Sequence, residues 1–113
     1  MAVTKELIAA STRPLILSIL SRGESYGYSI IQEVRGRSGG EIGWTEGMLY
    51  PVLHRLEREG LVRSRWAVSE AGRRRKYYGL SARGKKALEG ERRQWSLVHS
   101  TLSGFWRTQP CST

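Results

Sequence analysis

The stretch from Trp44 to Leu80 decides the fold, and it reads WTEGMLYPVLHRLEREGLVRSRWAVSEAGRRRKYYGL. It predicts a helix over Thr45 to Glu59, because threonine is a favoured helix cap and the next residue, Gly60, favours a helix end. A strand over Leu61 to Val68, a tight turn and a return strand follow. A helix followed by a hairpin with a cationic tip is typical of a winged helix-turn-helix, which fills one groove of a duplex and probes the next. The sequence therefore predicts a regulator that binds duplex DNA.

The composition limits the class of protein. A length of 113 residues suits one domain, and 19 Lys and Arg against 10 Asp and Glu give a net charge of +9. Such an excess favours a polyanionic partner, either nucleic acid or an acidic membrane surface, although a soluble protein can also be basic incidentally. The lone Cys111 and the lack of a signal-peptide pattern over Met1 to Ala10 favour a reducing cytoplasm. No apolar run is long enough to cross a membrane, so no membrane partner is expected.

The segment before Trp44 predicts short helices. Thr4 is a suitable cap for a leading helix that ends at Ala10, and Pro14 suits the first turn of a second helix. A third helix follows Gly27, and Glu41 to Trp44 is predicted as a short strand.

Two faces are expected on the helix over Thr45 to Glu59. One is apolar and faces the core, with Leu49, Val52, Leu53 and Leu56. The opposite face is available to a partner and carries Gly47, Tyr50, His54 and Arg58, with Arg55 at its margin. Pro51 is unexpected inside a helix, because it removes a hydrogen bond and clashes one turn back. Starting the helix at Thr45 therefore requires a tolerated kink.

The hairpin shows the alternation of a half-buried strand. Val62, Trp66 and Val68 are expected on the inner side, and Arg63 and Arg65 on the outer side. In the return strand, the inward residues are expected to be Tyr78 and Leu80. The cations Arg73, Arg74, Arg75 and Lys76 are expected together at a solvent-facing tip.

A final helix is predicted from the cap Ser81 to about Trp106. Its apolar residues follow heptad spacing, interrupted by Glu91. The stripe packs on its own domain or on a second copy of the helix, and we favour the second copy and therefore a homodimer. The stripe consists of Leu88, Trp95, Val98, Leu102 and Phe105. We predict a mainly α fold with a small β-hairpin: a winged helix-turn-helix over residues 1–80, a C-terminal dimerisation helix over 81–107 and a flexible tail over 108–113.

Several motifs resemble the PadR family of bacterial transcriptional regulators. They cover most of Leu15 to Leu88. Leu-Tyr-Pro followed at this spacing by Arg-Lys-Tyr-Tyr is specific to the family. The matching elements are Tyr26-Gly27-Tyr28 with Ile30-Ile31, Gly47-Met48-Leu49-Tyr50-Pro51-Val52-Leu53, Leu56-Glu57-Arg58-Glu59-Gly60-Leu61-Val62, Arg73-Arg74-Arg75-Lys76-Tyr77-Tyr78 and Leu80-Ser81-Ala82-Arg83-Gly84.

The resemblance implies a homodimer of the small subfamily with one C-terminal helix, a pseudo-palindromic operator and, usually, repression. It also implies that Pro51 lies inside the recognition helix. Related small members hold flat hydrophobic or aromatic effectors between aromatic residues near the dimer axis, so Trp95 is either such an effector-binding residue or plain dimer core. Family members commonly carry a small hydroxyl residue at the position of Met48. A phosphate contact is therefore missing here or supplied by Thr45.

The DNA-contacting candidates combine the partner face of the helix with the hairpin tip. For each we weighed a structural role: capping for Thr45, packing against the hairpin for Tyr50, and simple surface positions for His54 and the arginine run. The candidates are Thr45, Tyr50, His54, Arg58, Arg73, Arg74, Arg75 and Lys76.

Catalytic chemistry has no support in the sequence. The histidines His54 and His99 are isolated and Cys111 is remote, so no metal site is expected. There is no nucleophile–base pair and no phosphate-binding glycine loop, so we expect neither an enzyme nor a cofactor. The alternatives to a DNA-binding regulator are a basic winged-helix module that binds RNA or the ribosome, and a protein-interaction adaptor.

Overall fold

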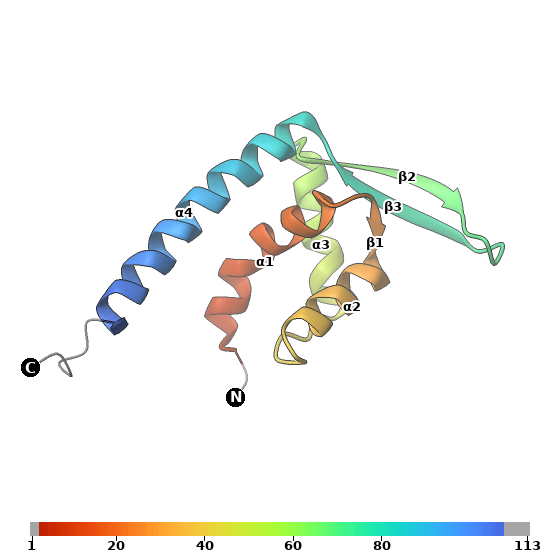
Figure 1. Ribbon diagram of the computed structural model, residues 1–113. Helices are drawn as coiled ribbons and strands as arrows, with labels where there is room; N and C mark the ends of the chain where they lie inside the picture. The colour runs from red at the N-terminus through yellow and green to blue at the C-terminus, as the bar shows by residue number, and fades with distance from the viewer. Residues whose placement is uncertain (1–2, 108–113) are drawn as a thin grey trace, which may run out of the picture.

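A computed structural model describes residues 3–107, so the predicted tail and Cys111 lie outside the described residues. Three helices form a body, and a β-hairpin and a long helix extend from it in opposite directions (Figure 1). The prediction of a mainly helical fold with a small β-hairpin is confirmed. The elements, in chain order, are α1 (Lys5–Leu20), β1 (Ser25–Tyr26), α2 (Gly27–Arg37), α3 (Glu46–Arg58), β2 (Val62–Val68), β3 (Arg74–Leu80) and α4 (Ala82–Arg107).

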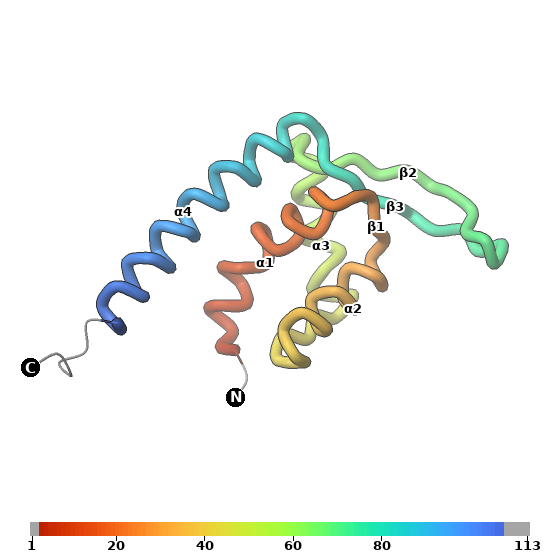
Figure 2. Tube along the Cα trace, viewed as in Figure 1, coloured from red at the N-terminus to blue at the C-terminus, as the bar shows by residue number. Residues whose placement is uncertain are grey.

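The core lies between α1, α2, α3 and the base of the hairpin. Figure 2 shows how the backbones of these elements come together. The inner faces of the three helices supply most of it, and the hairpin contributes Val62 and Tyr78. Apolar burial of this kind is the main stabilising term in a domain of this size. The fully buried large side chains are Ile16, Leu17, Ile30, Leu49, Leu53, Leu56, Val62 and Tyr78.

Helix α1 runs through Pro14, so the prediction of two separate helices was wrong. Proline removes the hydrogen bond that its own N–H would donate and crowds the carbonyl one turn back, which a bend accommodates, and its ring already has a helical φ angle. Buried Thr12 before it and fully buried Ile16 after it hold both halves of the helix on the body. The helix remains continuous, with a visible bend (Figure 1).

The predicted strand over Glu41 to Trp44 is also wrong. The sheet consists of three strands in the order β1-β3-β2, and residues 41–44 are not part of it. The second edge of β3 is taken by β1, a two-residue strand that pairs Ser25 with Tyr78 and Tyr26 with Tyr77. The segment before α3 instead turns, and Trp44 lies in the core with 2% of its surface exposed.

The helix predicted over Thr45 to Glu59 is present as α3. Thr45 caps it, because its hydroxyl oxygen accepts a hydrogen bond from the backbone N–H of Met48 at 3.2 Å. Pro51 lies inside the helix on the exposed side. The helix ends before Gly60, whose φ of +79° belongs to the left-handed region that glycine adopts without a Cβ clash.

Helix α4 is attached to the hairpin base by an unusually close backbone contact. Ser81 donates a hydrogen bond from its hydroxyl to the Gly60 carbonyl at 2.5 Å and accepts one from the Gly84 N–H at 3.0 Å. A Cβ atom added at Gly84 would collide with the carbonyl oxygen of Leu61. The absence of a side chain at Gly84 therefore lets the first turn of α4 lie directly on the end of the α3–β2 connection.

Replacing Gly84 with alanine should destabilise the protein by about 2 kcal/mol, because the colliding atom is backbone and cannot rotate away. Gly90, in the same helix, has open space around its Cα, so Gly90→Ala should instead stabilise by about 0.5–1 kcal/mol through helix propensity. Urea unfolding of the two variants measures the contrast. Equal effects at the two glycines would contradict the close contact.

Tyr78 is fully buried, and its hydroxyl has no hydrogen-bond partner among the described residues. Burial raises the pKa of Tyr78 to about 12, with smaller contributions from the Tyr50 phenol and the Glu57 carboxylate. Because the pKa of the folded state is the higher one, the neutral form stabilises the fold fully below pH 10. That contribution is lost as the pH rises toward 12.

Tyr78→Phe should therefore be neutral or stabilising by about 1 kcal/mol at pH 7, because it removes an unpaired buried hydroxyl. It should also reduce the loss of stability between pH 10 and pH 12. Thermal melts of both proteins across this range test the expectation. A strongly destabilised phenylalanine variant at pH 7 would show that the hydroxyl is satisfied after all.

Candidate nucleic-acid interface

One long face of α3 is open to solvent. Thr45, Gly47, His54, Arg55 and Arg58 are all exposed along it. Arg55 and Arg58 lie in the last turn, where a positive charge also interacts favourably with the helix dipole. The helix face predicted to contact a partner is therefore exposed, and its cations lie toward the C-terminal end of α3.

Tyr50 is placed differently from the other candidates on α3. It is half-buried, and its hydroxyl lies against Gly27 at the start of α2, where a Cβ would collide with it. Its ring also lies beside His54, with 6.2 Å between the ring centroids. Burial raises the pKa of Tyr50, and the Glu46 carboxylate adds to the effect. Packing of Tyr50 against the hairpin and a DNA contact from Tyr50 both stay predictions.

The register of the hairpin separates its side chains onto two faces. Directly paired residues in an antiparallel ladder project to the same side of the sheet. The pairs Val62–Leu80 and Ser64–Tyr78 face α3, and the Ser64 hydroxyl donates to the Glu57 carboxylate at 2.6 Å. The residues on this α3-side face are Val62, Ser64, Trp66, Val68, Arg74, Lys76, Tyr78 and Leu80.

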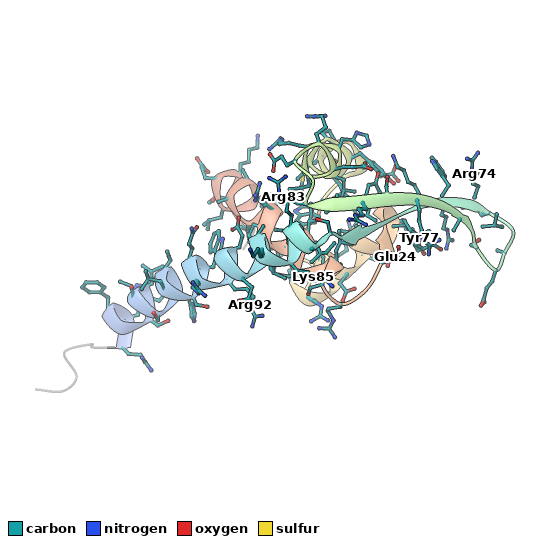
Figure 3. The ribbon with its side chains drawn as sticks, turned by 90° about the horizontal axis from the view of Figure 1, so that it is seen from above. Glu24, Arg74, Tyr77, Arg83, Lys85 and Arg92 are labelled. Atoms are coloured by element: carbon teal, nitrogen blue, oxygen red, sulfur yellow. The ribbon has the colours of Figure 1, made fainter. Side chains whose placement is uncertain are left out.

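The four cations of the predicted tip are therefore not together. Arg74 and Lys76 lie on the α3 side, whereas Arg75 lies on the opposite face, and Arg73 precedes β3 in the turn. Figure 3 shows Arg74 projecting toward the side of α3, and Tyr77 and Glu24 projecting away from it. Neighbouring residues of a strand project to opposite faces of the sheet, so only part of the Arg73 to Lys76 run lies on the α3 side.

Each of these strand cations stacks on an aromatic ring. The Arg74 guanidinium lies 4.6 Å from the Trp66 ring centroid, and the Lys76 ammonium lies 5.6 Å from that of Tyr78. On the other face, Arg75 lies 4.3 Å from the ring centroid of Tyr26. Such stacking restricts long side chains and fixes the positions of their charges.

The prediction that Trp66 and Val68 face inward was only half right. They share a face with buried Val62, but 56% of Trp66 and 71% of Val68 is exposed. The hairpin extends past the end of the helical body, so its outer half has no core to cover (Figure 1). Trp66 was therefore missed as a surface residue. Its pairing with Lys76 places Trp66 on this outer half, whereas strand alternation gives only the face of a residue and not whether a core lies beneath it.

The face of the hairpin away from α3 is partly neutralised. Arg65 forms an ion pair with Glu24 at 2.6 Å and lies over the Tyr77 ring. The hydrogen bonds from Arg65 lower the pKa of the Glu24 carboxyl, so this carboxylate keeps its charge to lower pH. This face is a weaker cationic surface than the one beside α3.

The apolar stripe on α4 divides into two parts. Leu88 is buried in the core of this chain, so its prediction as a dimerisation residue is corrected. Trp95 is half-buried and lines a hollow of about 360 Å³ with Pro14, Leu15 and Leu88. The rest of the stripe is exposed: Val98 by 51%, Leu102 by 42% and Phe105 by 73%.

Residues 3–107 hold neither a metal-binding cluster nor a helix that could span a membrane. No cluster of three His, Cys, Asp or Glu side chains is arranged to hold a metal ion there. In the same range, no helix is both long enough and apolar enough to cross a membrane.

A three-helix body with a capped, exposed α3 and a cationic hairpin beside it defines a winged helix-turn-helix protein. Residues 16–90 match the family described as "Transcriptional regulator PadR-like family". The chain belongs to this family, which confirms the resemblance found in the sequence. The prediction that the chain is not an enzyme is confirmed by the same membership, because members are transcriptional regulators.

Relatives and solved structures agree with this placement. Transcriptional regulator Rv3488 from Mycobacterium tuberculosis is 37% identical over 101 residues, covering 88% of this chain and 91% of that protein. A PadR family transcription regulator from Clostridium difficile R20291 is 35% identical with a TM-score of 0.75, covering 85% of this chain and 98% of that one. A PadR-like transcriptional regulator from Bacillus cereus is 27% identical with a TM-score of 0.83, covering 93% and 100%.

Replacing Arg74 and Lys76 together with alanine should weaken binding to duplexes of any sequence. Two fewer neutralised phosphates should reduce the slope of log affinity against log salt by roughly 2. Arg75→Ala is the matched control, because this arginine stacks in the same way on the opposite face. Its slope should stay at the wild-type value in fluorescence-anisotropy titrations. Equal effects from the two faces would contradict the division made by the register.

Proposed function

We propose that this regulator acts as a homodimeric repressor on a pseudo-palindromic operator. Each protomer places α3 in a major groove, and the two grooves lie about one helical turn apart. The hairpins contact flanking phosphates and the minor groove. The observation that carries this proposal is that Arg74 and Lys76 share the side of the exposed α3 face, so one surface can meet one duplex. The bound dimer represses transcription if the operator overlaps the DNA that RNA polymerase must occupy. The protein acts in the cytoplasm, where the operator lies.

Within this proposal, the individual residues have separable roles. Thr45 already caps α3 through its oxygen, which leaves its hydroxyl hydrogen free to reach a phosphate. Met48 is half-buried and packs against the core, so it offers no such donor. In this proposal, the exposed side chains of His54 and Arg58 contact base edges or the DNA backbone. Tyr50, whose hydroxyl lies against Gly27, packs beneath them.

The exposed part of α4 supports dimer formation. Val98, Leu102 and Phe105 occur at steps of four and three on a helix that projects from the body (Figure 1). A second copy of the same stripe covers these side chains from water, and the closed pairing uses the same residues on both protomers. Dimerisation through α4 also sets the spacing between the two α3 helices.

An effector site is the third part of the proposal. The hollow beside Trp95 is mostly apolar and lies between α1 and α4, which suits a flat hydrophobic or aromatic molecule. Such a ligand changes DNA affinity only if it binds one spacing of the protomers better than another. Because α4 both lines the hollow and carries the dimer stripe, the two functions are physically connected.

Leu102→Lys should convert the dimer to a monomer, because it places a charge in the centre of the apolar seam. Leu97 lies on the same helix, is 68% exposed, and is about 100° around the helix from Val98. Leu97→Lys is therefore the control and should stay dimeric. Sedimentation velocity at micromolar concentration distinguishes the two. A monomeric wild-type protein would contradict dimerisation by this helix.

Selection from a pool of random duplexes tests the function itself. The wild-type protein should enrich a sequence with two inverted half-sites whose centres are about 10 base pairs apart. His54→Ala should lower the preference for the selected site by roughly fivefold or more while leaving binding to random DNA nearly unchanged. Enrichment of structured RNA over duplex DNA in the same competition, or of no nucleic acid, would favour the alternative functions instead.

A further inference from the structure

Trp66 and Val68 form an exposed apolar surface on the outer half of the hairpin. Both are on the α3-side face, with Lys76 paired to Trp66 and Arg74 paired to Val68. More than half of each apolar side chain is open to solvent. We refer to these four residues as the wing surface. An isolated exposed tryptophan needs no explanation, but one placed beside two cations on the α3 side of the hairpin has a specific chemical complement.

We propose that Trp66 and Val68 pack on the deoxyribose sugars that form the wall of the minor groove contacted by the hairpin. In this arrangement, Trp66 packs on the sugars while Arg74 and Lys76 contact the phosphates that border them. The proposal rests on the duplex binding proposed above and adds a contact residue, Trp66, to it.

The chemistry of the two surfaces is complementary. The walls of the minor groove present apolar C–H edges of deoxyribose, and phosphates line its rims. The wing surface has a matching order, because the apolar Trp66 and Val68 lie on β2 and the cations Lys76 and Arg74 lie beside them on β3. An acidic protein surface would satisfy the cations but would leave Trp66 and Val68 without apolar neighbours. This combination therefore favours a sugar–phosphate partner.

The contact between Arg74 and Trp66 prepares the surface for binding. The Arg74 guanidinium lies 4.6 Å from the ring centroid of Trp66 and covers one side of the indole. Trp66 nevertheless keeps 56% of its surface exposed. Stacking limits the conformations of the arginine before DNA arrives, so less entropy is lost when it binds. Trp66 is accordingly both a contact residue and a positioning residue for Arg74.

The hairpin is also held at a fixed position relative to α3. Ser64 on β2 donates to Glu57 on α3, and Val62 and Tyr78 are buried in the common core. Figure 3 shows the hairpin extending away from α3 with Arg74 on the same side. A duplex whose major groove receives α3 therefore meets the wing surface along the same face of the protein, where the neighbouring minor groove lies.

Salt-dependent binding to an AT-rich duplex of about 30 base pairs separates the roles of these residues. Trp66→Ala should weaken binding by roughly 5- to 30-fold, because apolar area is lost at the contact. Its salt slope should stay close to that of the wild type, since an uncharged residue displaces no counterion. Arg74→Ala should lower the slope by about 1, and Trp66→Phe should retain most of the affinity.

Arg75→Ala, on the opposite face, should leave affinity and slope unchanged. The proposal is overturned if Trp66→Ala binds DNA within about twofold of the wild-type affinity. It is also overturned if Trp66→Ala loses affinity and lowers the salt slope as much as Arg74→Ala does, because Trp66 would then only position Arg74. Failure of the duplex-binding proposal is distinguishable, because the wild-type protein itself would then not bind.

A fluorescence measurement keeps the test independent of folding defects in the alanine variant. The chain has four tryptophans, and Trp66→Phe removes only the one on the hairpin. Duplex DNA should change the emission of the wild-type protein, and this change should be largely absent in Trp66→Phe. Saturating the duplex with netropsin, a minor-groove ligand, should suppress it as well. An emission change that survives netropsin, or that persists in Trp66→Phe, would overturn a minor-groove contact.

Discussion

The packing of Val62 and Tyr78 beneath α3 is the constraint on which the arrangement of the hairpin depends. Side chains alternate along a strand, so burying these two residues fixes which face every other hairpin residue occupies. A slip of one residue would move Arg74 and Lys76 away from α3 and bring Arg75 toward it. The cationic surface beside the recognition helix is therefore a consequence of core packing at the base of the hairpin, and not of the arginine run alone.

The same base of the hairpin also determines where α4 begins. Ser81 hydrogen-bonds to the end of the α3–β2 connection, and Gly84 lets the helix backbone approach the Leu61 carbonyl. From this point α4 leaves the body on the side away from the hairpin, as Figure 1 shows. The apolar stripe and the cationic surface are thus at opposite ends of one small protein. In the proposed dimer, this separation allows the second protomer and a duplex to bind without competing, and the shared base connects the two surfaces physically.

Local chemistry in the sequence was sufficient for much of the fold. The threonine cap, the glycine at the helix end and the serine before α4 predicted their elements correctly, because capping depends on a few neighbouring atoms. The continuity of α1 through Pro14 and the strand at Ser25–Tyr26 were missed, since both depend on tertiary contacts and on which edge of β3 is free. The positions of Trp66 and Leu88 were missed for a related reason: periodicity gives the face of an element but not whether the body extends far enough to cover it.

Footprinting on a selected operator tests the central claim most directly, namely that α3 and the hairpin of each protomer enter adjacent grooves of one duplex. Methylation of guanine N7 in the major groove should block binding in two half-sites about 10 base pairs apart, and hydroxyl-radical protection should extend into the minor groove outside each of them. Interference confined to a single half-site, or protection that never reaches the flanking minor grooves, would contradict the account.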